Sequence, residues 1–159
     1  MGYKNEFVLS ILKDLDIFSG IDSYALGELS ALFREKIFHQ GETIFEEDSI
    51  GNSMMIITSG EVRVSQTSDS NMEEALIILR AGDIFGEMAL IDDLPRSATI
   101  IAHTDVIIFE ISRSSFLNYI KNDCKNGIVM LLKLAKILSV RLRETDNKLK
   151  AFVHMSQWI

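Results

Sequence analysis

Residues 82–100 carry the most informative pattern of the chain and read GDIFGEMALIDDLPRSATI. The first half predicts a short helix around residues 86–89, directly after a strand. The first backbone N–H groups of such a helix have no partner within it and, with the helix dipole, form an anion site. Arg96 lies where the next strand begins, and its guanidinium can hold a phosphate through two hydrogen bonds.

Glu87 stands beside this predicted anion site. Its carboxylate would repel a phosphate unless the same ligand also donates a hydrogen bond to it, and a ribose 2′-hydroxyl is such a donor. A glycine, a glutamate, a short helix and a later arginine therefore fit a ribose-phosphate. The alternatives are structural: Glu87 can be an acid favoured at a helix N-terminus, or the surface ion-pair partner of Arg96.

Outward from this stretch, residues 37–111 predict short strands separated by glycine turns. Most segments are rich in β-branched and apolar residues, and residues 62–65 alternate apolar with polar side chains. Short strands at this spacing predict an antiparallel β-roll of the jelly-roll, cupin-like type. The polar residues 67–71 are expected to form the tip of a hairpin.

Helices are expected on both sides of the roll, which makes the fold class α+β. Residues 1–36 predict N-terminal helices, the second of them capped by Asp22 or Ser23. Residues 112–159 predict C-terminal helices that end in one long helix. We therefore expect one domain over residues 1–159, made of N-terminal helices, a roll and C-terminal helices.

The long helix carries an apolar line whose spacing alternates between four and three residues. The line consists of Leu131, Ala135, Leu138, Leu142, Thr145, Leu149 and Phe152. Such a line is typical of a coiled-coil seam, so we expect a parallel homodimer. The alternative is a helix that is buried once, on its own domain. A second apolar line of Ile128, Leu132 and Leu134 can pack on the roll.

The composition excludes several classes of protein. The chain has 159 residues and a formal net charge of −7, which argues against binding to nucleic acid or to an anionic membrane surface. No apolar run approaches the ~20 residues of a membrane-spanning helix. Cys124 is the only cysteine, which favours a reducing compartment, so we expect a cytoplasmic protein.

No residue pattern predicts catalysis or metal binding. His39, His103 and His154 have no metal-ligand spacing, and Cys124 has no nearby histidine to activate it. We therefore expect no metal, no cofactor and no enzymatic activity. The basic residues of the last helix are expected to form a solvated face: Arg141, Arg143, Lys148 and Lys150.

Residues 85–90 followed by residues 95–99 resemble the phosphate-binding cassette of the cyclic nucleotide-binding domain family, in particular the sensor domain of catabolite activator protein-like regulators. The strand and turn pattern of the family is matched by residues 41–45, 55–62 and 82–83. The resemblance covers residues 7–152, nearly the whole chain, and implies a cyclic nucleotide as ligand.

The resemblance also implies roles for the cassette. Glu87 would accept a hydrogen bond from the ribose 2′-hydroxyl, and Arg96 would pair with the cyclic phosphate. The cradle would be completed beside Gly86 by the backbone N–H groups of Met88 and Ala89.

The base of the ligand would contact other parts of the chain. Val64 and Leu76 would line its pocket, and Ser97 would bind a phosphate oxygen or the base of cyclic GMP in its syn form. Thr145 lies on the seam, where a polar residue costs stability. Its hydroxyl, with Asp146 of a partner helix, could accept from the adenine 6-amino group, which favours cyclic AMP.

We therefore expect a cyclic nucleotide sensor that passes ligand binding through its last helix to a dimer interface or to a separate effector protein. Cyclic GMP is the alternative ligand. One alternative function is the sensor domain of a transcription regulator, cut off before its DNA-binding part, because no helix-turn-helix can be placed before Ile159. Another is a family member that binds a different nucleotide, such as cyclic di-GMP, or none.

Overall fold

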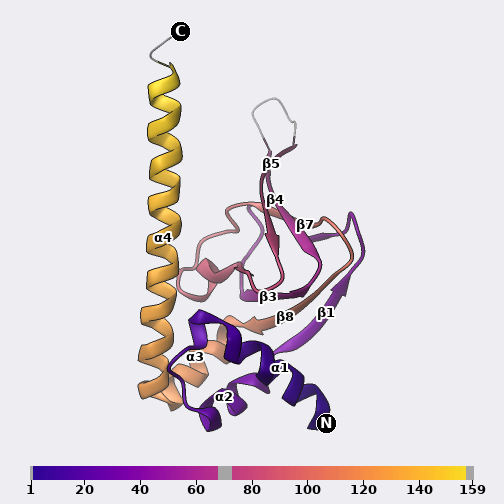
Figure 1. Ribbon diagram of the computed structural model, residues 1–159, viewed down its shortest axis with the longest axis vertical. Helices are drawn as coiled ribbons and strands as arrows, with labels where there is room; N and C mark the ends of the chain where they lie inside the picture. The colour runs from indigo at the N-terminus through magenta and orange to yellow at the C-terminus, as the bar shows by residue number, and fades with distance from the viewer. Residues whose placement is uncertain (1, 68–72, 157–159) are drawn as a thin grey trace.

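The computed structural model describes residues 2–67 and 73–156. Side chains are described except at residues 2–5, 67, 73–76, 152, 155 and 156. Two antiparallel sheets form a central roll, short helices cover one end of it, and a long helix runs along its side and beyond (Figure 1). The predicted α+β class is confirmed. Most of the expected hairpin tip, residues 68–71, lies outside the described residues.

Polar side chains cap the start of α2 (Ser23–Ser30) and of α3 (Arg113–Asn122) among the helices of the structure. The helices are α1 (Gly2–Asp14), η1 (Asp16–Phe18), α2, η2 (Glu87–Leu90), α3 and α4 (Cys124–Ser156). The carboxylate of Asp22 accepts from two backbone N–H groups in the first turn of α2, and the hydroxyl of Ser112 accepts from one, that of Ser115, at the start of α3. Of the two caps considered for the second helix, the structure selects Asp22.

The strands form two sheets of four. They are β1 (Arg34–Phe38), β2 (Thr43–Phe45), β3 (Ser53–Ser59), β4 (Glu61–Thr67), β5 (Glu73–Arg80), β6 (Ile84–Phe85), β7 (Thr99–Ala102) and β8 (Val106–Ser112). The sheet orders are β1-β8-β3-β6 and β2-β7-β4-β5. The predicted start of the roll at residue 37 is wrong by three residues. Antiparallel pairing with β8 extends β1 back to Arg34, which lies opposite Glu110.

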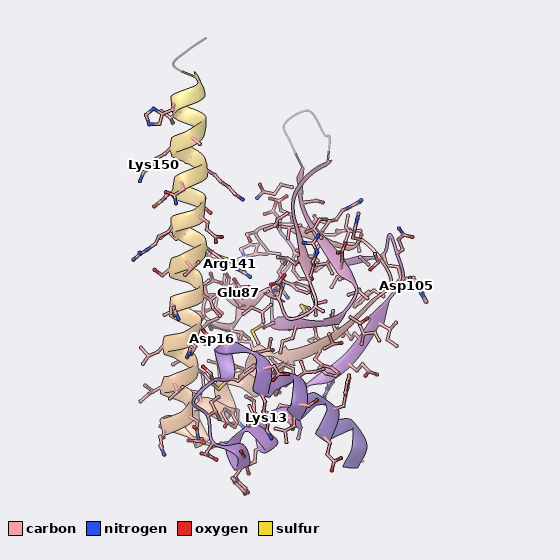
Figure 2. The ribbon with its side chains drawn as sticks, in the orientation of Figure 1. Lys13, Asp16, Glu87, Asp105, Arg141 and Lys150 are labelled. Carbon is pink, nitrogen blue, oxygen red and sulfur yellow. The ribbon has the colours of Figure 1, made fainter. Side chains whose placement is uncertain are left out.

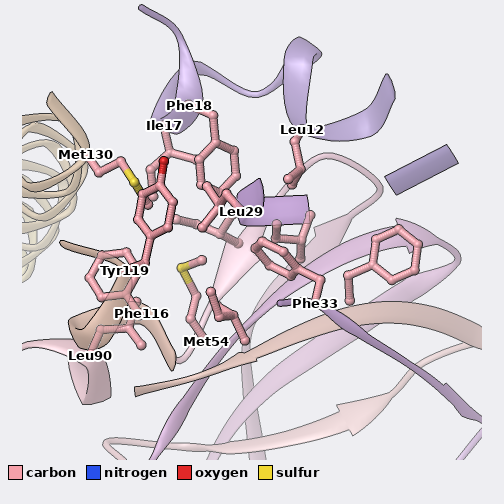
Figure 3. Close-up of a cluster of buried hydrophobic side chains, with 14 of the residues drawn as sticks. Leu12, Ile17, Phe18, Leu29, Phe33, Met54, Leu90, Phe116, Tyr119 and Met130 are labelled. Carbon is pink, nitrogen blue, oxygen red and sulfur yellow. The ribbon is translucent and has the colours of Figure 1, made fainter. Parts of the chain in front are cut away.

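The core has two parts because side chains alternate across the strands. On β3, Met54 and Ile56 face the helices, whereas Met55 and Ile57 face the interior of the roll. Figure 3 shows the helical part, where the rings of Phe116 and Tyr119 of α3 lie in one cluster with Phe18 of η1 and with Phe33, which follows α2. The cluster anchors α4 to the roll, since Met130 is fully buried in it.

The long helix α4 packs with one stripe and exposes another. Met130 and Leu134 are buried, and Ile137 packs against the same cluster. The prediction that Ile128 and Leu132 pack on the roll beside Leu134 is wrong, because both are exposed. In the described part of the chain, no helix is long and apolar enough to cross a membrane.

Candidate functional site

Arg96 is held in place through both its backbone and its side chain. Its backbone N–H donates to Ser49 O at 2.9 Å, and its carbonyl accepts from Asp48 N at 2.9 Å. Its Nη1 donates to Ser53 O at 2.9 Å and to Gly86 O at 3.1 Å. Only 7% of the residue is exposed, so the predicted alternative of a surface ion pair with Glu87 is wrong.

Two glycines make room for this guanidinium. Gly86 has φ 69°, which favours glycine, and a Cβ there would lie 2.6 Å from Arg96 Nη1. A Cβ on Gly51 would lie 2.8 Å from Ala89 Cβ and 3.2 Å from Arg96 Nε. The ring of Phe45 stacks below the guanidinium, with 4.1 Å from Arg96 Cζ to the ring centroid. The site is therefore shaped around one arginine.

The burial of the Arg96 guanidinium favours binding of an anion. Burial lowers the pKa of its guanidinium, and the carboxylates of Glu110 and Glu87 act in the opposite direction. Among the described residues, Arg96 Nε is buried without a hydrogen-bond partner. A buried donor without an acceptor is costly, so an anionic ligand at this place would remove a penalty.

Glu87 is almost fully buried, with 2% of the residue exposed, and its partner is Arg141 of α4. Arg141 Nη1 lies 2.5 Å from Glu87 Oε1, and Arg141 Nη2 donates to Ile84 O at 2.7 Å. Figure 2 shows the two side chains meeting between α4 and the roll. The expectation that Arg141 belongs to a solvated face is wrong, because this ion pair connects α4 to η2.

The sequence does contain a signal for Arg141. Met130, Leu134, Ile137 and Arg141 follow one another at spacings of four, three and four residues, so the arginine continues the stripe of α4 that packs on the core. A charged residue on a buried stripe needs an opposite charge nearby. Such a residue therefore indicates a buried carboxylate on the surface that the helix covers.

These groups surround one cavity of about 260 Å³. Most of the predicted site residues line it: Val64, Gly86, Glu87, Met88, Ala89, Arg96, Ser97 and Thr145. The side chain of Leu76 lies outside the described residues. Asp146 is exposed and does not line the cavity, because it lies about 100° around α4 from Thr145.

The cavity also has walls that sequence reasoning missed. Ile77 and Leu79 of β5 form an apolar side with Val64, and Ile77 lies directly opposite Val64 across the strands. The long helix adds Glu144 and Lys148. A register shift between β4 and β5 beyond Val64 changes which residues of β5 face the cavity, and a local sequence pattern does not reveal such a shift.

Thr145 lines the cavity of its own chain, and its hydroxyl donates to Arg141 O at 3.0 Å. The oxygen can still accept a hydrogen bond from a ligand. Among the described residues, no group of three His, Cys, Asp or Glu side chains is placed to hold a metal ion. The polar groups of the cavity are suited to binding an anion with hydroxyl groups and an apolar ring.

A β-roll with a buried arginine, a short helix and a glutamate around one cavity defines a ribose-phosphate-binding module. The chain belongs to the cyclic nucleotide-binding domain family, whose sequence model matches residues 35–123. A "Cyclic AMP receptor protein" from Thermus thermophilus is 30% identical over 138 residues, which is 87% of this chain and 62% of that protein. The chain thus spans about three fifths of this relative.

Solved structures of the same fold are also similar. A cyclic nucleotide-binding domain from Methylobacillus flagellatus has a TM-score of 0.79 and 25% identity, covering 91% of this chain and 81% of that one. The regulatory domain of Toxoplasma gondii PKA, solved with cAMP, has a TM-score of 0.75 and 28% identity, covering 86% of this chain and 50% of that one. The predicted family and fold are confirmed, and the chain is a cyclic nucleotide-binding regulatory domain.

Proposed function

We propose that the cavity binds cyclic AMP, one molecule per chain. The observation that carries this proposal is the pairing, in one cavity, of a buried arginine whose Nε lacks a partner with a buried glutamate. The cyclic phosphate pairs with Arg96 and with the N–H groups of Met88 and Ala89. These groups provide the charge-assisted hydrogen bonds that hold phosphates most strongly.

The remaining walls of the cavity provide the proposed contacts for the ribose and the base. A carboxylate has two oxygens, so Glu87 Oε2 can accept from the 2′-hydroxyl while Oε1 keeps Arg141. Val64, Ile77 and Leu79 offer an apolar surface to the base. In this proposal, Thr145 accepts from the adenine 6-amino group, which cyclic GMP lacks.

Binding is transmitted by α4 through a shift of populations. The phosphate contacts lie on the cassette, whereas Arg141, Glu144, Thr145 and Lys148 reach the cavity from α4. A ligand that touches both elements favours the state in which they are close together. The position of α4, and of a dimer partner or a separate effector protein bound to it, then depends on the ligand.

We also propose that α4 forms a parallel homodimer. Residues 142–150 of α4 are all exposed, and Leu142 and Leu149 of the predicted seam are 63% and 61% exposed. A helical segment as short as residues 142–150 is marginal in water without packing, so contact with a second copy would stabilise it. Ile128, three residues before Leu131 and exposed as well, extends the seam toward the N-terminus of α4.

A second candidate function is the sensor part of a transcription regulator. This candidate is favoured by the similarity to the N-terminal domain of a transcriptional regulator from Streptomyces coelicolor, which has a TM-score of 0.74 and 26% identity. We propose that residues 1–159 act as one regulatory unit in either case. A cytoplasmic location stays a prediction.

Calorimetric titration of cyclic AMP and cyclic GMP into protein that has been unfolded and refolded tests the proposed ligand. We expect one site per chain and tighter binding of cyclic AMP. Tighter binding of cyclic GMP would reverse the base assignment. Absence of binding by either would favour another nucleotide, such as cyclic di-GMP, or the loss of ligand binding.

The variant Thr145→Ala tests the base contact. It should reduce the ratio between the affinities for cyclic AMP and cyclic GMP, because the hydroxyl that accepts from the 6-amino group is lost. Asp146→Ala, next to Thr145 but outside the lining of the cavity, is the matched control. It should leave the ratio unchanged if the base contact is made within one chain. An unchanged ratio in Thr145→Ala would contradict the role of Thr145.

A further inference from the structure

Glu110 occupies a place where the strand alternation predicts an apolar residue. On β8, Val106 and Ile108 face the interior of the roll and are buried there. Glu110 follows in the same alternation, and its side chain is only 17% exposed. An acidic group in such surroundings is costly unless it is paired and hydrogen-bonded.

Both carboxylate oxygens of Glu110 are used. Ser53 Oγ donates to Glu110 Oε1 at 2.9 Å, and Lys36 Nζ lies 2.8 Å from Glu110 Oε2. Arg96 Nη2 donates to the same Ser53 Oγ at 3.3 Å. The contacts thus form a chain from Lys36 on β1, across β8 and β3, to the arginine of the cavity.

The direction of these hydrogen bonds follows from the chemistry of a hydroxyl. Serine has one O–H proton and two lone pairs. Because Glu110 accepts that proton, the lone pairs of Ser53 Oγ are left for Arg96 Nη2. Without Glu110, the hydroxyl of Ser53, which is buried, would be able to rotate and offer its proton elsewhere.

We propose that Glu110 is a positioning residue that acts through Ser53 to hold the Arg96 guanidinium in its phosphate-binding orientation. This inference rests on the proposed function, because the phosphate is that of the cyclic nucleotide. Lys36 fixes the carboxylate from the other side. The relay keeps the guanidinium in place while the cavity is empty, so ligand binding does not have to order it.

The electrostatics of the site agree with this role. Glu87, the acid of the same cassette that also lines the cavity beside Arg96, is bonded to Arg141. Of the two carboxylates that offset the effect of burial on the pKa of Arg96, Glu110 has the larger influence and Glu87 the smaller. The counter-charge of the phosphate-binding arginine therefore comes mainly from β8, fourteen residues further along the chain.

Two substitutions of Glu110 separate positioning from charge. In calorimetric titrations of the full chain with cyclic AMP, Glu110→Ala should bind about tenfold more weakly, as expected for loss of a charged hydrogen bond. Glu110→Gln keeps an acceptor for Ser53 and should remain within about threefold of the wild type. Equal losses in both variants would indicate a pure charge effect and overturn the relay.

Glu61→Ala is the matched control. Glu61 also pairs with a basic side chain, with 2.9 Å from its Oε1 to Arg80 Nε, but it does not line the cavity. Its substitution should leave the affinity unchanged. A loss as large as that of Glu110→Ala would show that removing any paired acid weakens binding, and would overturn the proposal.

A double-mutant cycle distinguishes positioning from general destabilisation. In the Arg96→Ala background, Glu110→Ala should cause no further loss of affinity. In the wild-type background, the double variant Ser53→Ala/Glu110→Ala should bind no more weakly than whichever of its two single variants has the lower affinity. Additive losses would overturn the relay. If the wild type binds neither cyclic AMP nor cyclic GMP, the proposed function fails and the relay with it. If the wild type binds and Glu110→Ala binds equally well, only the relay fails.

Discussion

Arg96 is a fixed positive charge in surroundings that leave only 7% of the residue exposed. Arg96 Nη1 donates to two carbonyl oxygens and Nη2 donates once, to Ser53 Oγ. The Nε–H group and the second N–H group of Nη2 therefore remain available for a ligand. Arg96→Ala should weaken binding of cyclic AMP by about 2–4 kcal/mol, as for removal of one partner of a buried charge pair. Calorimetry measures this, and unchanged affinity would contradict the cassette assignment.

Two variants control for this substitution. Arg80→Ala removes an arginine that is 67% exposed and pairs with Glu61, and it should leave the affinity unchanged. Arg96→Lys keeps the charge but not the planar fork of donors, so it should recover only part of the lost affinity.

Gly51 is required by space rather than by backbone conformation. A Cβ at this position would lie 2.8 Å from Ala89 Cβ and 3.2 Å from the Arg96 side chain, and no positive φ is involved. Gly51→Ala should therefore push η2 and the guanidinium apart, lower the free energy of unfolding by about 1–3 kcal/mol and weaken binding. Urea unfolding and calorimetry measure the two effects.

Gly27→Ala is the matched control, because a Cβ on this residue of α2 meets nothing within 4 Å. It should be neutral or should stabilise the protein by about 0.5–1 kcal/mol, since alanine is the better helix former. If Gly51→Ala behaved in the same way, the close packing around Arg96 would not matter for stability.

Whether a residue of the site could be predicted depends on how far its partners lie from it in the sequence. Glu87 and Arg96 were predictable because one short motif contains both. Ser53, Glu110 and Arg141 were not, because each becomes important only through contacts with residues more than 40 positions away. Their signals are visible afterwards: an acid on an apolar strand face, and an arginine on a buried helix stripe.

At the scale of elements, one ion pair connects α4 to η2. Arg141→Ala would leave the buried carboxylate of Glu87 without its partner. It should lower the free energy of unfolding by about 1–3 kcal/mol and weaken binding of cyclic AMP, because Glu87 loses its orientation. Arg143→Ala, two residues along the same helix and exposed, should change neither quantity. Equal effects of both variants on unfolding and calorimetry would contradict a specific role for Arg141.

The boundaries and faces of elements were predictable only where local chemistry sets them. The caps of α2 and α3 follow from Asp22 and Ser112, whose side chains bond to the first turn. The start of β1 does not, because the partner strand β8 decides where pairing begins. The two faces of α4 were separable by spacing alone, but the surface that covers each face depends on the tertiary structure.

At the scale of the whole molecule, the cavity lies where α4 continues beyond the buried stripe that packs it on the core. Arg141 anchors the middle of α4, and Lys133 Nζ pairs with Asp16 at 2.8 Å nearer its N-terminus. Beyond residue 141 the described side chains of α4 are all exposed as far as residue 151. Figure 1 shows this part of the helix standing clear of the roll, so a ligand that contacts Thr145 and Lys148 acts where α4 is least restrained.

The exposed seam of α4 leads to a prediction for the assembled molecule. If two copies pair along Ile128, Leu131, Leu142 and Leu149, the mass in solution should be twice 17.9 kDa. Leu142→Glu places a charge at the centre of the seam and should give monomers, because an unpaired charge in a coiled-coil core is strongly unfavourable. Light scattering after gel filtration measures the mass of each variant.

Val140→Glu provides the control for this substitution. Val140 is 48% exposed on the same helix, but it lies two residues from Leu142 and so on another face. It should leave the dimer intact, since the added charge stays in water. Dissociation by both variants would indicate that a charge anywhere on α4 disrupts assembly, and a monomeric wild type would contradict the dimer itself. Because the seam passes through Thr145 at the cavity, a true dimer should also bind cyclic AMP more tightly than the Leu142→Glu monomer.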